Sequence, residues 1–255
     1  MKKIILLQVV LFFLISTGYS QRFIGQGIAG INVSQVDGDE VFGYHKVGFN
    51  GGASVMLPLE KKQRFFITIE LLYSEQGAYR KTPGDTMIYT GKTPIDEKFA
   101  YNPKIKYKLT LDYVQVPVVF HFEDKTTGVA FGAGLAWGRL VRAQEIESGY
   151  RLITNVRSGI YSRNEWSVLG DIKIPIYKGL KFNFRFHYSF VPIRKRDFTD
   201  KETGKQWTRN QNHNILTFRV IYEFNGKYSL NMKMKSDGTR NGAKWVREDL
   251  YQQKY

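Results

Sequence analysis

Two side chains in this 255-residue chain have the types and spacing of a nucleophile and its base. His187 and Ser189 are two positions apart, so on a β-strand they share one face. A histidine beside a serine can accept the hydroxyl proton and direct the oxygen at an ester. Same-face pairs also arise by chance on strands, and catalysis needs further groups that orient the pair. We therefore predict that the protein is not an enzyme.

The same pair is similar to the short His-x-Ser signature of the outer-membrane lipid A deacylase family. That resemblance implies hydrolysis of a lipid ester, for which the pair should face lipid. Here both residues lie on the polar face of their segment, and Phe190 stands where the signature has Asn. A lipid-modifying enzyme therefore remains an alternative hypothesis.

Charged side chains recur at alternate positions of segments that are otherwise apolar. On strands such residues share a face, and in an interior an unpaired charge would cost several kcal/mol. We therefore predict a crossed network of opposite charges. Its members are Glu70, Asp112, Asp171, Lys173, Lys181, Arg185, Arg219 and Glu223, with Lys106 and Lys108 as further candidate cations.

No residue pattern predicts a metal or cofactor site. The chain has no Cys, which excludes disulfides, thiolate zinc sites and a cysteine nucleophile. Residues 37–40 read Asp-Gly-Asp-Glu, but the rest of an EF-hand calcium loop is missing. Gly25, Gly27 and Gly30 have the spacing of a dinucleotide-binding fingerprint, but no helical pattern follows them. We expect neither a metal nor a cofactor.

Residues 1–20 have the form of a secretory signal peptide. Lys2 and Lys3 precede an apolar run over 4–15, and small residues lead to a cleavage position before Gln21. The run is too short for a membrane-spanning helix, which needs about 20 residues. The formal net charge of +15 suggests an anionic partner, but export argues against nucleic acid.

After residue 20 the chain alternates apolar and polar residues with the period of β-strands. The alternation is clearest over 180–190. Over 105–122 the apolar set changes phase near 112–114, which predicts a β-bulge there. Eight strands are predicted, over 23–34, 46–57, 65–74, 105–122, 129–138, 166–174, 180–190 and 215–224.

Short and long connections alternate between these strands. The short ones are 58–63, 123–127 and 177–179, and the long ones are 35–43, 77–104, 143–163 and 191–211. Bacterial outer-membrane barrels combine short periplasmic turns, long outer loops and an even number of strands. We therefore predict an all-β fold, an eight-stranded antiparallel up-and-down transmembrane β-barrel over 21–224, in the bacterial outer membrane.

The apolar face of these strands should point outward into lipid. An eight-stranded barrel has an interior just wide enough to be filled by side chains. Phe182, Phe184 and Phe186 would crowd that interior, whereas Gly132 and Gly134 leave room for charged side chains. The lumen is therefore predicted to be polar and filled rather than an open pore. A secreted lipocalin-like carrier with an apolar interior is the soluble alternative.

Aromatic residues near strand ends predict interfacial girdles. They are Phe65, Tyr73, Tyr107, Phe122, Trp137, Trp166, Tyr188 and Tyr222. Pro117 and Pro175 fall inside predicted strands, and a closed barrel has no edge to accommodate them. We place both near periplasmic strand ends, as local breaks in pairing.

Two segments outside the strands are basic. Arg194, Lys195 and Arg196 begin a loop over 191–213 with a net charge of +3; it is either a contact for lipopolysaccharide phosphates or a solvated loop. The segment 225–255 has a net charge of +4 and begins with Asn225-Gly226, a hairpin signal. We predict a basic periplasmic tail or an extra hairpin there, and a periplasmic or membrane protein as its partner.

Several stretches resemble the PorT-type, porin-family outer-membrane barrels of Bacteroidota. They are Gly-Ile-Asn-Val-Ser-Gln at 30–35, Val-Gly-Phe-Asn-Gly-Gly at 47–52, and the segments 69–77 and 111–117. The resemblance implies an eight-stranded barrel surrounded by outer-membrane lipid. Because the family's named member supports gliding and type IX secretion, it also implies a scaffold or assembly role, which we expect the loops and tail to perform.

Overall fold

The computed structural model describes most of the chain between residues 23 and 247. The described ranges are 23–39, 43–60, 64–80, 87–89, 107–147, 150–152, 154, 156–177, 179–200, 203–224, 232–236 and 243–247. The predicted signal peptide, Lys106, and Asn225-Gly226 at the start of the tail lie outside them.

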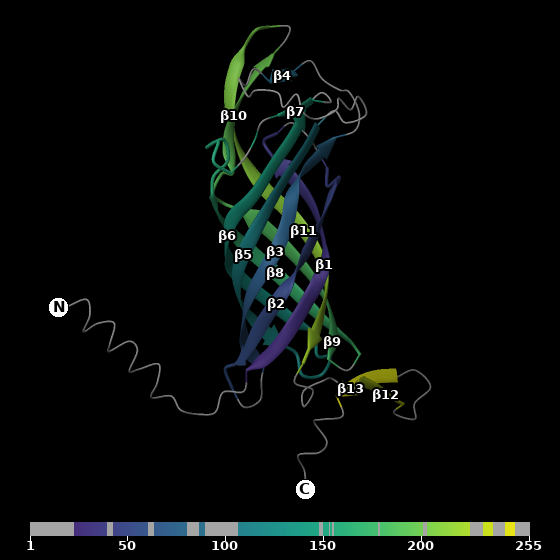
Figure 1. Ribbon diagram of the computed structural model, residues 1–255. Coiled ribbons are helices and arrows are strands. Elements are labelled where there is room, and N and C mark those ends of the chain that lie inside the picture. The colour runs from purple at the N-terminus through teal and green to yellow at the C-terminus, as the bar shows by residue number, and fades with distance from the viewer. Residues whose placement is uncertain are drawn as a thin grey trace, which may run out of the picture.

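Eight long strands among the described residues form one closed antiparallel ring (Figure 1). Each is paired with its neighbours in chain order, and the first strand pairs with the last. The strands are β1 Ile24–Asp37, β2 Lys46–Pro58, β3 Phe65–Arg80, β5 Tyr107–Glu123, β6 Ala130–Glu147, β8 Asn164–Tyr177, β9 Leu180–Ser189 and β11 Gln206–Glu223. The predicted eight-stranded up-and-down barrel is confirmed.

The two ends of the barrel differ. At one end the connections β2–β3, β5–β6 and β8–β9 are short, and this is the periplasmic end. β3, β6 and β11 are 16 to 18 residues long in total, more than the 9–11 that span a membrane. The strands therefore project beyond the membrane on the extracellular side. No helix in the described ranges is long and apolar enough to cross a membrane.

Short strands extend the sheet at the extracellular end (Figure 1). They are β4 Met87–Tyr89, β7 Tyr150–Leu152 and β10 Arg194–Asp200. β10 pairs with β11 and with β4, and β7 pairs with β6. The prediction of one long loop over 191–211 was therefore wrong, because β10 and the first part of β11 form a hairpin there.

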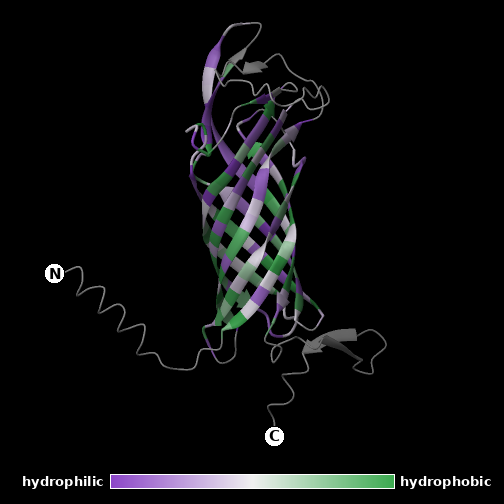
Figure 2. Cartoon of the chain, in the orientation of Figure 1, coloured by the Kyte–Doolittle hydropathy of each residue, from purple (hydrophilic) through white to green (hydrophobic). Residues whose placement is uncertain are grey.

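The apolar face of every strand points outward. One exposed residue from each strand illustrates this: Ile31, Phe49, Ile69, Phe120, Leu135, Val168, Phe186 and Val220. Phe186 is 40% exposed, and Phe182 and Phe184 share its outer face. Figure 2 shows hydrophobic residues alternating along the barrel body, whereas hydrophilic residues predominate near β10. The predicted outward facing is confirmed, and the lipocalin-like alternative is excluded because these apolar side chains need lipid as their solvent.

The register shift near residue 112 has a different cause from the one predicted. The odd-numbered residues of β5 stay buried from Tyr107 to Glu123, so β5 does not bulge. Asp112 pairs with Arg142 and Tyr113 with Leu140, which leaves Val141 of β6 as the extra residue. Apolarity changes phase on β5 because its inward face becomes apolar toward the extracellular end, where Leu109 and Leu111 are buried.

Both prolines lie at irregularities in strand pairing. The β3–β5 ladder runs from Phe65 to Ile69 and resumes at Leu72, and the gap is opposite Pro117. Since proline has no N–H, this interruption is expected, but it lies in the middle of the apolar belt and not at the periplasmic end as predicted. Pro175 is next to a register shift at the β8–β9 turn, as expected.

One predicted girdle residue was misplaced. Tyr107 is buried inside the barrel end, because it shares the inward phase of β5. The other predicted girdle residues lie on the outer face.

The tail contains a second, two-stranded sheet. β12 Met232–Ser236 pairs antiparallel with β13 Ala243–Arg247. This sheet lies in the segment for which a basic tail or an extra hairpin was predicted, and Asn225-Gly226 lies outside the described residues.

Candidate functional site: a filled lumen and its extracellular cap

The middle of the lumen contains an ion-paired group that we call the central cluster: Glu70, Asp171, Asn183, Arg185 and Arg219. Arg185 donates from Nη1 and Nη2 to the two Glu70 oxygens at 2.9 and 2.8 Å. It also donates to Asp171 Oδ2 at 2.5 Å. Arg219 Nη1 donates to Glu70 Oε2 at 3.0 Å, and its Nε donates to Asn183 Oδ1 at 2.7 Å. These bonds connect β3, β8, β9 and β11 across the barrel.

Every member of the central cluster is almost fully buried. Alternation in β3, β8, β9 and β11 directs these side chains inward, and the bidentate Arg–carboxylate geometry is the strong form of an ion pair. Asn183 Nδ2 donates both to Asp171 and to the Ile172 carbonyl oxygen. The cluster therefore fills the cross-section with paired charges, as the sequence led us to expect for Glu70, Asp171, Arg185 and Arg219.

Lys173 is next to this cluster but is not hydrogen-bonded within the described part of the chain. Its Nζ lies 5.5 Å from the centre of the Phe66 ring, and that ring stacks on His121. His121 Nε2 is 3.4 Å from Asp171 Oδ2. Lys173 thus balances the charges of Glu70 and Asp171 at longer range, and its cation–π contact with Phe66 stabilises its own charge.

A second ion group closes the periplasmic end of the lumen. Lys181 Nζ lies 2.9 Å from Glu223 Oε1 and 3.6 Å from Glu123 Oε2. Gln26 Nε2 donates to Glu223 Oε1 at 3.0 Å, and Ser54 Oγ donates to Gln26 Oε1 at 2.7 Å. The predicted residues Lys181 and Glu223 therefore pair with each other, separately from the central cluster.

Glu165 contacts two histidines on the extracellular side of the central cluster. His213 Nδ1 is 2.8 Å from Glu165 Oε1, and His187 Nε2 is 3.8 Å from the same oxygen. Ser189 Oγ accepts the backbone N–H of His213 at 2.7 Å. His187 and Ser189 are both buried inside the barrel, so their environment is the lumen and not the lipid.

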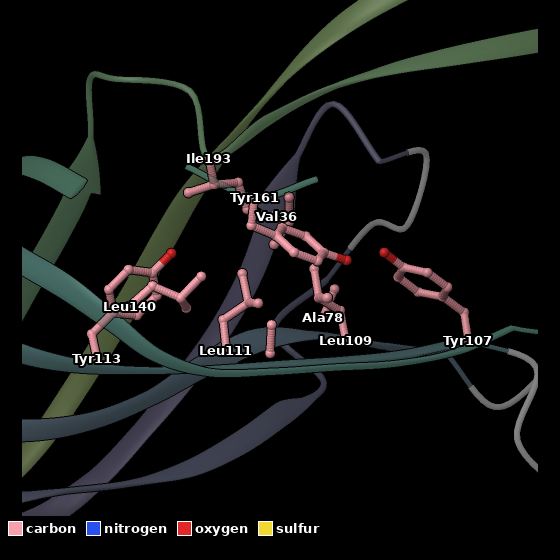
Figure 3. Close-up of a cluster of buried hydrophobic side chains, with 10 residues drawn as sticks. Val36, Ala78, Tyr107, Leu109, Leu111, Tyr113, Leu140, Tyr161 and Ile193 are labelled. Carbon is pink, nitrogen blue, oxygen red and sulfur yellow. The ribbon is translucent and has the colours of Figure 1, made fainter. Parts of the chain in front are cut away.

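An apolar layer follows toward the extracellular end (Figure 3). Side chains of β5, among them Leu109 and Leu111, point toward Tyr161 and Ile193 from the connecting segments. The layer consists of Val36, Ala78, Tyr107, Leu109, Leu111, Tyr113, Leu140, Ala143, Tyr161 and Ile193. It packs the interior where the strands leave the membrane, and its apolarity was not predicted.

A third ion group covers this layer, and we call it the cap: Arg194, Arg196, Glu145, Glu147 and Tyr161. Arg194 donates from Nη1 and Nη2 to the two Glu145 oxygens, each at 2.9 Å. Tyr161 donates to Glu145 Oε2 at 2.6 Å and accepts from Arg194 Nη1 at 2.9 Å. Arg196 Nη2 donates to Glu147 Oε1 at 2.9 Å. The cap binds β10 to β6.

Burial and the neighbouring arginines set the ionisation of the cap, which lies outside the membrane. Burial raises the pKa of the Tyr161 hydroxyl well above its usual value. Burial alone would also raise the pKa of Glu145, but the Arg194 and Arg196 guanidinium groups and the Tyr161 hydrogen bond together outweigh it, so the pKa of Glu145 is lowered. Glu145 is therefore ionised and Tyr161 neutral around neutral pH, which suits the hydrogen bonds that they make.

Two of the three residues named for the predicted basic loop are therefore buried. Arg194 and Arg196 are 5% exposed, because alternation on β10 turns both toward the acidic residues of β6. Of the three predicted residues, only Lys195 is exposed. The spacing held a signal that we did not use, since Glu145 and Glu147 have the same two-residue step as the arginines.

Asp112 does not belong to the lumen network. It lies on the outward phase of β5 and is covered by its neighbours. Tyr73 donates its hydroxyl to Asp112 Oδ2 at 2.7 Å, and Arg142 Nε donates to the same oxygen. The prediction was wrong because it assumed a bulge on β5. Within the described residues, no group of three or more His, Cys, Asp or Glu side chains could hold a metal ion.

The chain is similar in sequence and structure to outer-membrane barrels. The family described as "Outer membrane protein beta-barrel domain" matches residues 21–195. No curated protein matches the chain.

Solved structures with a similar fold include three bacterial surface proteins. Neisserial surface protein A is 13% identical with a TM-score of 0.42, over 79% of this chain and 97% of that chain. A major outer membrane protein from Thermus thermophilus is 10% identical with a TM-score of 0.41, over 81% of this chain and 100% of that one. Ail, the attachment invasion locus protein of Yersinia pestis, is 11% identical with a TM-score of 0.39, over 79% of this chain and 99% of that one.

Proposed function

This chain belongs to the outer membrane protein β-barrel domain family, and we propose that it acts as a non-enzymatic scaffold or interaction protein of the outer membrane. In this proposal the barrel is a closed anchor, and the segments beyond the membrane make the contacts. The observation that carries the proposal is the central cluster, in which Glu70 binds Arg185 and Arg219 across the lumen.

A filled lumen argues against a role as a pore. The central cluster, the periplasmic Lys181 group and the cap are stacked along the same interior, with the apolar layer beneath the cap. An eight-stranded barrel leaves little space beyond its side chains. We expect the purified barrel to insert into planar bilayers without steady unit conductance, while an open porin conducts in the same set-up. Stable open channels would refute the closed anchor.

The position of His187 and Ser189 supports a non-enzymatic role. A lipid-hydrolysing pair must reach lipid, whereas these residues are buried in the lumen. Ser189 Oγ accepts the His213 N–H, and among the described residues no hydrogen bond joins Ser189 to His187. We expect the mass spectrum of lipid A to be the same in cells that carry the parent chain and in cells that carry Ser189→Ala. An acyl chain missing from lipid A only with the parent would restore the lipid-modifying alternative.

The surfaces offered to partners are the β10–β11 hairpin and the tail. The buried Arg194–Glu145 pair fixes the base of the hairpin to β6. The basic tail includes the β12–β13 sheet and would face a periplasmic or membrane protein. The PorT-type resemblance supports secretion or gliding machinery as the setting.

Cross-linking in intact cells tests this assignment. The full chain should capture the same proteins repeatedly, and two variants locate the contact: one without 225–255, and one in which a short turn replaces 197–207. Both variants keep the membrane-spanning part of every barrel strand and the Arg194–Glu145 pair. Loss of the captured proteins with either variant supports the proposal. If a variant with both changes captured the same proteins as the full chain, the proposal would be contradicted. Unaltered type IX secretion and gliding in a strain that lacks the gene would argue against the PorT-type setting.

A further inference from the structure

The outer surface of the β6–β8 seam combines aromatic and basic side chains where the barrel leaves the outer leaflet. Trp137 and Trp166 are direct cross-strand partners and are 36% and 45% exposed. The next outward pair toward the extracellular side is Arg139 and Asn164. Arg139 Nη1 donates to Asn164 Oδ1 at 2.8 Å. Tryptophan marks the headgroup level of a membrane, so Arg139 lies at the level of lipid phosphates.

The bulge in β6 adds a second arginine to this surface. With unbroken alternation Val141 would face outward and Arg142 inward. Because Val141 is the extra residue, both face outward, and the Arg142 side chain is 51% exposed. Bulges commonly redirect a side chain in this way. Asp112 accepts from Arg142 Nε and so holds the guanidinium against the barrel.

A third arginine comes from the segment before β8. Arg163 is exposed, and its carbonyl oxygen accepts the N–H of Leu140 at 2.9 Å, which fixes its backbone beside β6. Among the described residues, the carboxylates on this side are Asp112, which binds Arg142, and Glu75, which forms an ion pair with Lys46. Within the described ranges, Arg139 and Arg163 contact no carboxylate, so the surface retains positive charge.

We propose that Arg139, Arg142 and Arg163 bind a phosphate group of an outer-leaflet lipid, the phosphorylated glucosamine headgroup of lipopolysaccharide. Guanidinium groups bind phosphate oxygens in a bidentate fashion, and long arginine stems extend along apolar surface to the headgroup layer. The Trp137–Trp166 pair lies below them, where acyl chains begin. This site replaces the predicted contact at Arg194 and Arg196, which are buried, and it is independent of the scaffold role.

The test uses the full-length barrel in mild detergent and measures its binding of fluorescent lipopolysaccharide. The variant Arg139→Gln/Arg163→Gln keeps Arg142, whose loss would leave Asp112 without its cation. We expect affinity to fall at least about tenfold, since a charge-assisted hydrogen bond contributes on that scale. The control variant Arg64→Gln/Lys125→Gln removes one exposed and one half-buried cation at the periplasmic end and should bind like the parent. Unchanged heat-modifiable migration in gels shows that each variant is folded.

Two further binding measurements identify the ligand. The parent should bind dephosphorylated lipopolysaccharide weakly. That affinity should be no higher than the affinity of Arg139→Gln/Arg163→Gln for intact lipopolysaccharide. Inorganic phosphate alone should not displace the lipid at millimolar concentration. Equal loss of affinity in both double variants would overturn the proposal, because general positive charge would then explain binding. Full displacement by inorganic phosphate would also overturn it, because the site would then take free phosphate.

Discussion

Replacing Glu70 by Gln tests whether the central cluster stabilises the barrel. Gln has nearly the same shape as Glu but lacks its charge. In the parent, Glu70 receives two hydrogen bonds from Arg185, at 2.9 and 2.8 Å, and one from Arg219 at 3.0 Å. After Glu70→Gln the two buried guanidinium groups share one carboxylate, Asp171, which lies 3.8 Å from Arg219 Nη2.

The expected loss of stability follows from that geometry. Removing one partner of a buried ion pair costs about 3–5 kcal/mol, because the other charge stays buried without compensation. The introduced glutamine retains one acceptor oxygen, and Asp171 still binds Arg185, so the lower end of the range applies. We expect the free energy of unfolding to fall by about 3 kcal/mol. The double variant Glu70→Gln/Arg185→Gln should lose less than the sum of the two single variants.

Urea titration of the barrel in lipid vesicles, followed by the fluorescence of its four Trp residues, measures this change. Lys205→Gln is the control, because it removes an exposed charge on the β10–β11 hairpin and should change stability by less than about 0.5 kcal/mol. If Glu70→Gln unfolded within about 0.5 kcal/mol of the parent, the buried charges would have to be hydrated, and the view of a filled lumen would be wrong.

Three further predictions concern the cap and the strand packing. Tyr161→Phe removes the hydroxyl that donates to Glu145 at 2.6 Å; it should speed amide hydrogen exchange in β10 by an amount equivalent to about 1–2 kcal/mol, and exchange in β9 should stay constant. The lowered pKa of Glu145 means that its stabilising charge is complete above the ordinary carboxyl value of about 4.3 and is lost only as pH falls through the lower folded value. Exchange in β10 should therefore stay protected down to that pH, and loss of protection that began near neutrality would contradict the assignment. Gly134→Ala would place a Cβ 2.2 Å from the Val118 carbonyl oxygen and should lower the free energy of unfolding by about 1–3 kcal/mol. At Gly170 a Cβ meets nothing within 4 Å. Gly170→Ala should therefore show a higher folded fraction in gels after refolding than Gly134→Ala.

The fold could be predicted from sequence because lipid imposes a simple rule on the outer face. Each outward position within the membrane must be apolar, so Phe182, Phe184 and Phe186 alternate with polar residues, and the strand period is visible. The rule fails above the membrane. There the interior of β5 is apolar, at Leu109 and Leu111, and hydropathy inverts without any change in the backbone. A bulge and a change of environment produce the same pattern, so the sequence could not tell them apart.

The site could be predicted only where that rule holds. Glu70, Asp171, Arg185 and Arg219 were grouped correctly from their phase alone, and the structure brings them together. Asp112 was grouped with them because the inferred bulge reversed its facing. The cap was missed because Arg194 and Arg196 occur in a polar stretch that reads as a loop, and their burial depends on pairing with β6 across about fifty positions of sequence.

The central cluster also links closure of the barrel to satisfaction of its charges. Glu70 is separated by 115 residues from Arg185 and by 149 from Arg219. In an isolated hairpin of β2 and β3, Glu70 therefore has neither of its arginine partners. In an isolated hairpin of β8 and β9, Arg185 has Asp171 as its carboxylate partner but not Glu70. Desolvating an unpaired carboxylate is costly, so an open sheet would keep its inner face hydrated until β3 faces β9 and β11. Ring closure and pairing of Glu70 should then occur as one step, which disfavours partly closed sheets with exposed edges in the membrane.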